Sequence, residues 1–171
     1  AEHFNCPLIL IDTPFLYGEA EDHSVDFVRR QIEDAIPVAE RIAGKSLSDR
    51  KRHKVMHNAR DGVELWSQIL ECGTARPTPI TAFDEFIHMA PIVEMRGEEF
   101  TVSYYNSMLK ELRKRVRDGT GALRNERKRL LWDNLPIWHR VRWLSNLLAS
   151  HGVALVASTY TDAWGELASL F

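Results

Sequence analysis

The segment at residues 126–157 constrains the fold of this chain more than any other stretch. A short apolar run at residues 130–132 is followed by polar residues and by Pro136, which a first helical turn accepts because its N–H group would have no partner. Apolar side chains then recur every three or four residues until Gly152, a residue that suits the left-handed end of a helix. The following run, residues 153–157, is apolar on both faces, as in a strand buried within a parallel sheet. The segment therefore predicts a strand–helix–strand (βαβ) unit.

A second buried strand is predicted near the start of the chain. Residues 7–11 are apolar and run directly into Asp12 and a proline turn. Open α/β sheets bind ligands at the carboxyl ends of their strands, so Asp12 is a candidate substrate-binding residue. Asp12 is explained equally well as the cap of the turn before Pro14, and the sequence leaves both roles open.

Helical periodicity dominates the region between these two strand segments. The expected helices end at Gly44, run from Ser46 or Ser48 to Gly73, and cover residues 81–89 and 98–118. The last of them has the clearest amphipathic pattern. The side chains that we expect to point inward from it are Tyr104, Tyr105, Met108, Leu109, Leu112 and Val116.

These elements predict an α/β fold, in which Rossmann-like or flavodoxin-like parallel-sheet segments are separated by a helical middle layer. More than one hundred residues without a convincing strand lie between the two strand segments, too many for an ordinary crossover connection. We therefore expect residues 1–45 to form the end of a first α/β domain, residues 46–125 a helical connecting region, and residues 126–171 the start of a second α/β domain.

The residues that follow the last predicted strand are candidates for a binding site. Thr159 and Tyr160 come directly after it, at the end where ligands of α/β sheets collect. Thr161 and Asp162 then begin the next expected helix, whose first N–H groups suit a phosphate or a thioester oxygen. Alternatively, Asp162 serves only as the N-cap of that helix.

Large aromatic side chains cluster in the last third of the chain. Four of them are Trp132, Trp138, Trp143 and Trp164. They either wall a dry pocket, with Trp138 as a candidate substrate-binding residue, or belong to the core.

Residues 110–142 carry eleven basic and four acidic residues, although the formal net charge of the chain is -2. The surplus suits phosphates or an acidic protein surface, or it is a solvated helix face. Arg129 is a candidate substrate-binding residue because it lies beside the predicted strand, and its alternative role is an ion pair with Glu126. The slightly acidic chain as a whole argues against nucleic acid as the main partner.

The cysteine content and the hydropathy pattern indicate a cytoplasmic protein. Cys6 and Cys72 give neither a disulfide framework nor a CxxC pair, and we expect each to be a small buried side chain. No apolar run approaches the roughly 20 residues that a membrane span requires, so no membrane partner is expected.

A set of these residues resembles the central part of the 2-hydroxyacyl-CoA dehydratase and benzoyl-CoA reductase family. The set comprises the segment at residues 7–14 with Gly44, Lys45, Arg96, Gly97, Tyr105, Glu126, Arg129, Trp132, Asp133, Pro136, Trp138, Gly152 and Tyr160. The resemblance extends over residues 7–164. It implies an iron–sulphur subunit that accepts single electrons from an ATP-hydrolysing activator and uses them to reduce a CoA thioester. In the dehydratases a ketyl radical then loses water, whereas the reductases reduce an aromatic ring.

The resemblance also implies partners and a cofactor that this chain does not complete. Family members pair with a second homologous subunit and act on an acyl-CoA or aromatic acyl-CoA substrate. Their [4Fe–4S] cluster needs three or four thiolates, so its ligands are expected outside these residues, and no metal ligand is predicted here. The substrate-binding candidates are Thr159, Tyr160, Trp138, Arg129 and Asp12, and the catalytic residues remain unassigned.

A non-catalytic role is the alternative. The chain contains no complete catalytic constellation and no GxGxxG, P-loop or GxSxG motif. An α/β-helical scaffold or a subunit-docking module is therefore the second hypothesis.

Overall fold

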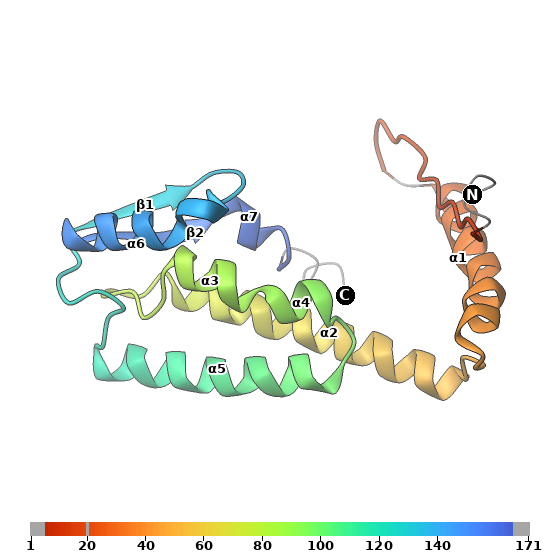
Figure 1. Cartoon of the computed structure of the whole chain (residues 1–171), viewed down its shortest axis with the longest axis horizontal. Helices are drawn as coiled ribbons and strands as arrows, with labels where there is room; N and C mark the ends of the chain where they lie inside the picture. The colour runs from red at the N-terminus through yellow and green to blue at the C-terminus, as the bar shows by residue number, and fades with distance from the viewer. Residues whose placement is uncertain (1–5, 20, 166–171) are drawn as a thin grey trace. The chain divides into compact units, whose positions relative to one another are not determined.

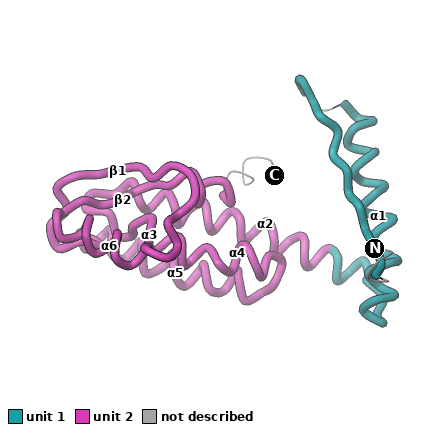
Figure 2. The backbone as a smooth tube through the Cα atoms, turned by 45° about the horizontal axis from the view of Figure 1, so that its top comes forward, with its two compact units in different colours: residues 1–52 teal, residues 53–171 magenta. Residues whose placement is uncertain are grey.

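The structure, a computed structural model, describes residues 6–19 and 21–165. The chain divides into two compact units, Ala1–Arg52 and His53–Phe171 (Figure 2). The division into three domain segments expected from the sequence stays a prediction. No helix among the described residues has the length and apolar character needed to cross a membrane.

The first unit contains one long helix, α1 (Asp22–Ala43), which includes Pro37 and ends at Gly44. Gly44 has φ 62°, in the left-handed region that favours glycine, so the predicted end of this helix is confirmed.

The strand predicted at residues 7–11 is wrong. The segment has no regular secondary structure, and its side chains are exposed, Leu8 by 72% and Leu10 by 76%. A strand requires a neighbouring strand for its backbone hydrogen bonds, and none lies among the described residues of this unit. Instead, the Asp12 N–H donates to Gln31 Oε1 at 2.8 Å, and Gln31 Nε2 donates to the Asp12 carbonyl at 2.9 Å.

The second unit is built on a helical layer. The helices are α2 (Asp49–Cys72), whose first residues belong to the first unit, α3 (Ala82–His88), α4 (Ala90–Glu94) and α5 (Glu99–Asp118). Figure 1 shows α2, the α3–α4 pair and α5 running alongside one another, and they enclose a common core. Its buried members are Val63, Trp66, Ile69, Ile80, Met89, Ile92, Tyr105, Leu109 and Leu112.

The predicted helices are confirmed, with one correction to the inward face of α5. Tyr105, Leu109 and Leu112 are buried as expected, but Val116 is 41% exposed. Val116 lies in the last turn, close to Gly119, where α5 ends with φ 64°. The apolar spacing of the sequence continues to Val116, but the other helices do not cover this last turn of α5.

The βαβ prediction is also confirmed. Strands β1 (Lys128–Trp132) and β2 (Val153–Ser158) pair in parallel, with Leu130 opposite Leu155, and α6 (Val141–Ser150) connects them. A 3₁₀ turn, η2 (Trp138–Arg140), precedes α6, so regular helix begins later than Pro136 indicated. Together with the helical layer, this parallel pair confirms the α/β class.

A second core cluster attaches the sheet to the helical layer. Phe83 and Phe86 of α3 and Leu155 of β2 are buried together, and Leu144 and Leu148 of α6 pack against them. Helix α3 therefore joins the helical layer to the sheet, because it packs against β2.

The helix that follows β2, α7 (Thr159–Asp162), begins two residues earlier than predicted. Ser158 is its N-cap, since Ser158 Oγ accepts a hydrogen bond from the Tyr160 N–H at 3.2 Å. Asp162 is accordingly the last residue of this short helix, and the alternative that made it an N-cap is wrong.

Candidate functional site

The carboxyl ends of β1 and β2 lie beside each other, because Trp132 pairs with Ser158 in the parallel register. Thr159 joins the two ends. Its Oγ1 donates to Asp133 Oδ1 at 2.9 Å and accepts from the Asn134 N–H at 3.0 Å. Asn134 has φ 69°, a conformation that asparagine tolerates better than most residues. The hydroxyl of Thr159 thus fastens the loop after β1 to the start of α7.

Tyr160 and Trp138 lie at the same edge. Their ring centroids are 6.1 Å apart, and Phe86 is 6.4 Å from Tyr160 and 6.1 Å from Trp138. All three pairs have the edge-to-face arrangement that aromatic rings favour. Trp138 remains 52% exposed. The structure therefore brings together three of the predicted site residues, Thr159, Tyr160 and Trp138, and leaves an aromatic face open to solvent.

Arg129 has a different environment. Its Nη1 donates to Glu126 Oε1 at 2.7 Å and to the Ala75 carbonyl at 2.8 Å, and its Nη2 donates to the Gly73 carbonyl at 2.6 Å. Both side chains of the ion pair are largely buried, with exposed fractions of 18% for Arg129 and 9% for Glu126. The ion pair with Glu126, which was the alternative role expected for Arg129, is present. Through its bonds to Gly73 and Ala75, Arg129 also links β1 to the loop after α2.

Asp12 belongs to the first unit, where its side chain is exposed and its backbone is held by Gln31. Within the second unit, the described contacts of Arg129 do not reach the Thr159 edge. The roles of Asp12 and Arg129 in substrate binding stay predictions.

The four tryptophans do not share one pocket in the described contacts. Trp143 is 56% exposed, and Trp164 packs against the helical core with the Arg96 guanidinium 5.7 Å from its ring centroid. Trp132 donates from Nε1 to the Leu135 carbonyl at 3.3 Å. The fully buried tryptophan among the described residues is Trp66 of α2. The role of the other four as walls of a dry pocket stays a prediction.

Sequence reasoning missed Glu85, which is fully buried beneath the Thr159 edge. Thr161 Oγ1 donates to Glu85 Oε2 at 2.8 Å, while Glu85 Oε1 makes no hydrogen bond to any described residue. The neighbouring Trp66 Nε1 donates to the Thr161 carbonyl at 3.1 Å. A usable signal existed: Glu85 falls at helical spacing between the buried Ala82 and Met89, where an apolar residue is expected.

Burial raises the pKa of Glu85 to about 8. The hydrogen bond from Thr161 opposes this rise, and the carboxylates of Asp162 and Asp84 add to it. At neutral pH the side chain is therefore mainly a protonated, uncharged acid. It holds a proton directly under the first turn after β2.

The two cysteines of this chain are fewer than the three or four thiolates that an iron–sulphur cluster needs. Cys72 is partly buried, packs against the helical core and donates from Sγ to the Gln68 carbonyl at 3.3 Å. Burial raises the pKa of its thiol, which opposes the thiolate form that iron requires. Cys6 is exposed, so the expectation of a buried side chain is wrong for Cys6. Among the described residues, no group of three or more His, Cys, Asp or Glu side chains is arranged to hold a metal ion.

Comparison with known proteins places these features in a family. The family model described as 2-hydroxyglutaryl-CoA dehydratase, D-component, matches residues 1–168. The alpha subunit of (R)-2-hydroxyisocaproyl-CoA dehydratase from Clostridioides difficile is 30% identical over 167 residues, which cover 96% of this chain and 41% of that protein. The alpha subunit of (R)-2-hydroxyglutaryl-CoA dehydratase from Acidaminococcus fermentans is 29% identical, covering 96% of this chain and 35% of that protein.

A reductase is similar to the same extent. One of the subunits of benzoyl-CoA reductase from Thauera aromatica is 30% identical over 174 residues, covering 95% of this chain and 40% of that protein. The chain thus spans about two fifths of the length of these relatives. Because the family model and the relatives match nearly the whole chain, the chain belongs to the 2-hydroxyglutaryl-CoA dehydratase D-component family.

Proposed function

We propose that the full-length protein containing this chain is an enzyme subunit that transforms a CoA thioester, either by dehydrating a 2-hydroxyacyl-CoA or by reducing an aromatic acyl-CoA. The observation that carries the proposal is the edge formed by Thr159, Tyr160 and Trp138, in a chain that is as similar to dehydratase subunits as to a reductase subunit. In this proposal, the step that both reactions share is single-electron reduction of the thioester.

In this proposal, the chain binds and orients the acyl group. The exposed ring of Trp138 and the neighbouring ring of Tyr160 offer an apolar surface to the acyl chain or aromatic ring. Thr159 acts as a positioning residue, since its hydroxyl already bonds Asp133 and the Asn134 N–H. Fixed loops of this kind hold a substrate in a reactive orientation.

The electrons and the cluster come from elsewhere in this scheme. A [4Fe–4S] cluster would need cysteines outside the described residues, because two cysteines cannot supply three or four thiolates. The partners would be a second homologous subunit and an ATP-dependent activator, and the location the cytoplasm. No step of the reaction is assigned to a residue of this chain.

The first test is to purify the full-length protein with its partner subunit in the absence of oxygen. We expect about four irons per subunit and a reducible brown chromophore, followed by turnover of an acyl-CoA when activator and ATP are added. Iron-free, colourless protein after anaerobic handling would contradict the enzyme proposal and favour the scaffold alternative.

The second test addresses the edge itself. Trp138→Ala should raise the KM for the acyl-CoA by about tenfold, since it removes the exposed wall of the proposed acyl site. Trp143→Ala is the matched control, because Trp143 is exposed to a similar extent, 56% against 52%, but does not contact Tyr160 in the described ring pairs. Equal KM values for both variants would place the acyl group elsewhere.

A further inference from the structure

Four arginines line a polar cleft at the opposite, amino-terminal edge of the sheet. Arg129 is held by its ion pair with Glu126, and the other three are exposed. Arg76 lies in the loop after α2, and Arg124 and Arg127 lie in the segment that leads into β1. The cleft has a volume of about 750 Å³. We call this cavity the arginine cleft, after its exposed arginines Arg76, Arg124 and Arg127. Arg124 and Arg127 belong to the basic region at residues 110–142, for which the sequence suggested phosphates, an acidic protein surface or solvent. The proposed acyl site at the Thr159 edge does not use the cleft.

The positive charge of the arginine cleft is not neutralised by the protein residues that the structure describes. The side chains of Arg76 and Arg124 are exposed and form no hydrogen bond or ion pair with a described residue. The guanidinium of Arg127 makes one hydrogen bond, from Nη2 to the His151 carbonyl at 3.3 Å. The carboxylate that lines the cleft, Glu126, is already paired with Arg129 at 2.7 Å. Three like charges in one concavity repel each other, and a bound anion relieves that repulsion.

The walls of the cleft are fixed before any ligand binds. The Ala122 N–H donates to the Thr78 carbonyl at 2.7 Å, and the Thr78 N–H donates to Glu126 Oε2 at 2.6 Å. These two bonds tie the loop that carries Arg76 to the segment that carries Arg124. The backbone that presents the guanidinium groups therefore needs little ordering when an anion binds.

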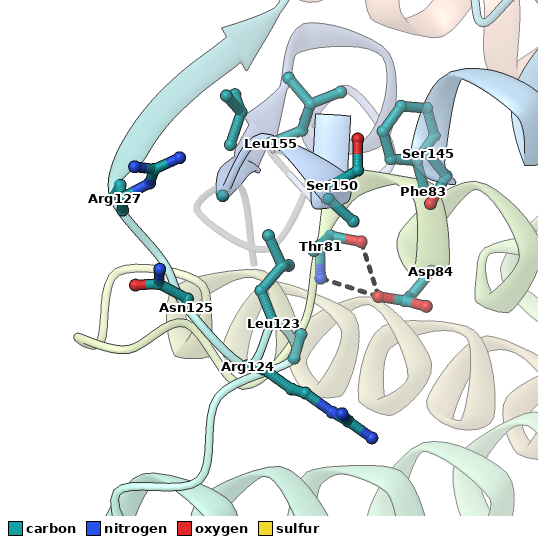
Figure 3. Close-up of a pocket in the computed structure, with 14 residues that line it drawn as sticks. Thr81, Phe83, Asp84, Leu123, Arg124, Asn125, Arg127, Ser145, Ser150 and Leu155 are labelled. Atoms are coloured by element: carbon teal, nitrogen blue, oxygen red, sulfur yellow. Dashed lines mark hydrogen bonds between the residues drawn. The ribbon is translucent and has the colours of Figure 1, made fainter. Parts of the chain in front are cut away.

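A second cavity adjoins the arginine cleft and shares Arg124, Asn125 and Arg127 with it (Figure 3). It has a volume of about 430 Å³, and Phe83 and Leu155 contribute apolar surface to it. Its carboxylate, Asp84, is occupied by hydrogen bonds from the Thr81 N–H and hydroxyl at 2.9 and 2.7 Å, drawn as dashed lines in Figure 3. A group attached to the anion can therefore enter this cavity past a carboxylate whose Oδ2 already accepts two hydrogen bonds.

We infer that the arginine cleft binds the phosphate groups of a small ligand, either a pyrophosphate or a phosphate ester. Guanidinium groups bind phosphate oxygens through paired, charge-assisted hydrogen bonds, and a concave, preformed site suits a small anion better than the flat surface of an acidic protein. Coenzyme A and a free nucleotide both carry such groups. Only the choice of coenzyme A as the source depends on the proposed function, while phosphate binding by the cleft does not.

The test is calorimetric titration of the full-length protein with pyrophosphate, ADP, coenzyme A and dephospho-coenzyme A. Pyrophosphate should bind saturably, and the affinity should fall as salt is raised. The double variant Arg124→Gln/Arg127→Gln should weaken binding by about tenfold or more. Arg76→Gln is the second variant, and it should also weaken binding. Because Arg76 makes no bond to a described residue, this substitution removes no bond within the described protein.

Arg142→Gln is the control, because Arg142 is an exposed arginine of α6 that does not line the cleft. Like Arg76→Gln, it removes one positive charge, and it should leave the affinity for pyrophosphate unchanged. Preference for coenzyme A over both ADP and its dephospho form would identify the thioester coenzyme as the source, whereas tighter binding of ADP than of coenzyme A would identify a nucleotide. Absence of saturable binding, or equal affinity in the double variant, would overturn the inference. A protein that lacks iron and turnover but binds pyrophosphate through these arginines would leave the inference standing while the proposed function fails.

Discussion

Glu85 is a carboxylic acid enclosed within the second unit, and its protonation links pH to stability. Its pKa is raised by burial from 4.5 to about 8, so between these values the folded protein holds a proton that the unfolded chain releases. Unfolding is then favoured as pH rises, because the unfolded state binds fewer protons than the native state. The stabilisation is fully present below about pH 4.5 and is lost as pH rises through about 8.

The prediction at this scale is that Glu85→Gln removes the pH dependence. The free energy of unfolding of the unsubstituted protein should fall by about 4 kcal/mol more than that of the variant between pH 5 and pH 8.5. Urea unfolding followed by tryptophan fluorescence at several pH values would measure it. Glu94→Gln, at an exposed position of α4, should leave the pH dependence unchanged. Parallel pH profiles for Glu85→Gln and the unsubstituted protein would contradict this account.

At the scale of single elements, the turn between α6 and β2 depends on Gly152. Gly152 has φ 69°, and a Cβ at this position would lie 2.5 Å from the Asn125 carbonyl oxygen. The Gly152 carbonyl also accepts hydrogen bonds from the Arg127 and Lys128 N–H groups at 2.7 and 3.0 Å. A shift of this turn therefore disturbs the entry to both strands.

Gly152→Ala should destabilise the protein by about 3 kcal/mol, the sum of about 1 kcal/mol for the left-handed backbone and a larger cost for the clash. Gly119→Ala provides a matched control: Gly119 has φ 64°, but no atom lies within 4 Å of the added Cβ. We expect Gly119→Ala to cost only the backbone component of about 1 kcal/mol. Thermal unfolding of both variants measures the difference, and equal losses would show that the backbone conformation alone matters.

The elements that sequence predicted correctly depend on neighbours within a few residues. The helical period identified α1, α2 and α5, and the doubly apolar run identified β2, because these patterns are local. Residues 7–11 have the composition of a buried strand, but composition does not provide the partner strand that a sheet needs.

The candidate site likewise has residues that a local sequence rule located and contacts that no local rule predicts. The rule that ligands collect at strand ends located Thr159 and Tyr160, which the structure places together with Trp138. The bond between Thr161 and Glu85 joins residues 76 positions apart, and no local pattern reports such a pair. Arg129 shows the same limit, since its acceptors at Gly73 and Ala75 lie in a loop that periodicity does not place.

For the whole molecule, burial is distributed very unevenly between the two units. Among the described residues of the first unit, only Ser24 is buried. Both core clusters belong to the second unit, where α2, α4 and α5 enclose one and α3, α6 and β2 enclose the other. The second unit therefore has the contacts that support a stable fold, while α1 of the first unit relies mainly on its own hydrogen bonds.

Hydrogen exchange of the 171-residue chain, followed by mass spectrometry, tests this difference. Helices α1 and α5 are similar in length, with 22 and 20 residues, so helix length does not decide the comparison. Amides of α5 should exchange about a hundredfold more slowly than those of α1, because opening α5 exposes Tyr105, Leu109 and Leu112. A helix without a packed face is only marginally stable in water, so α1 should exchange by local opening. Equal protection of the two helices would mean that α1 buries a face against another part of the protein, and the separation of the core into the second unit would then be wrong.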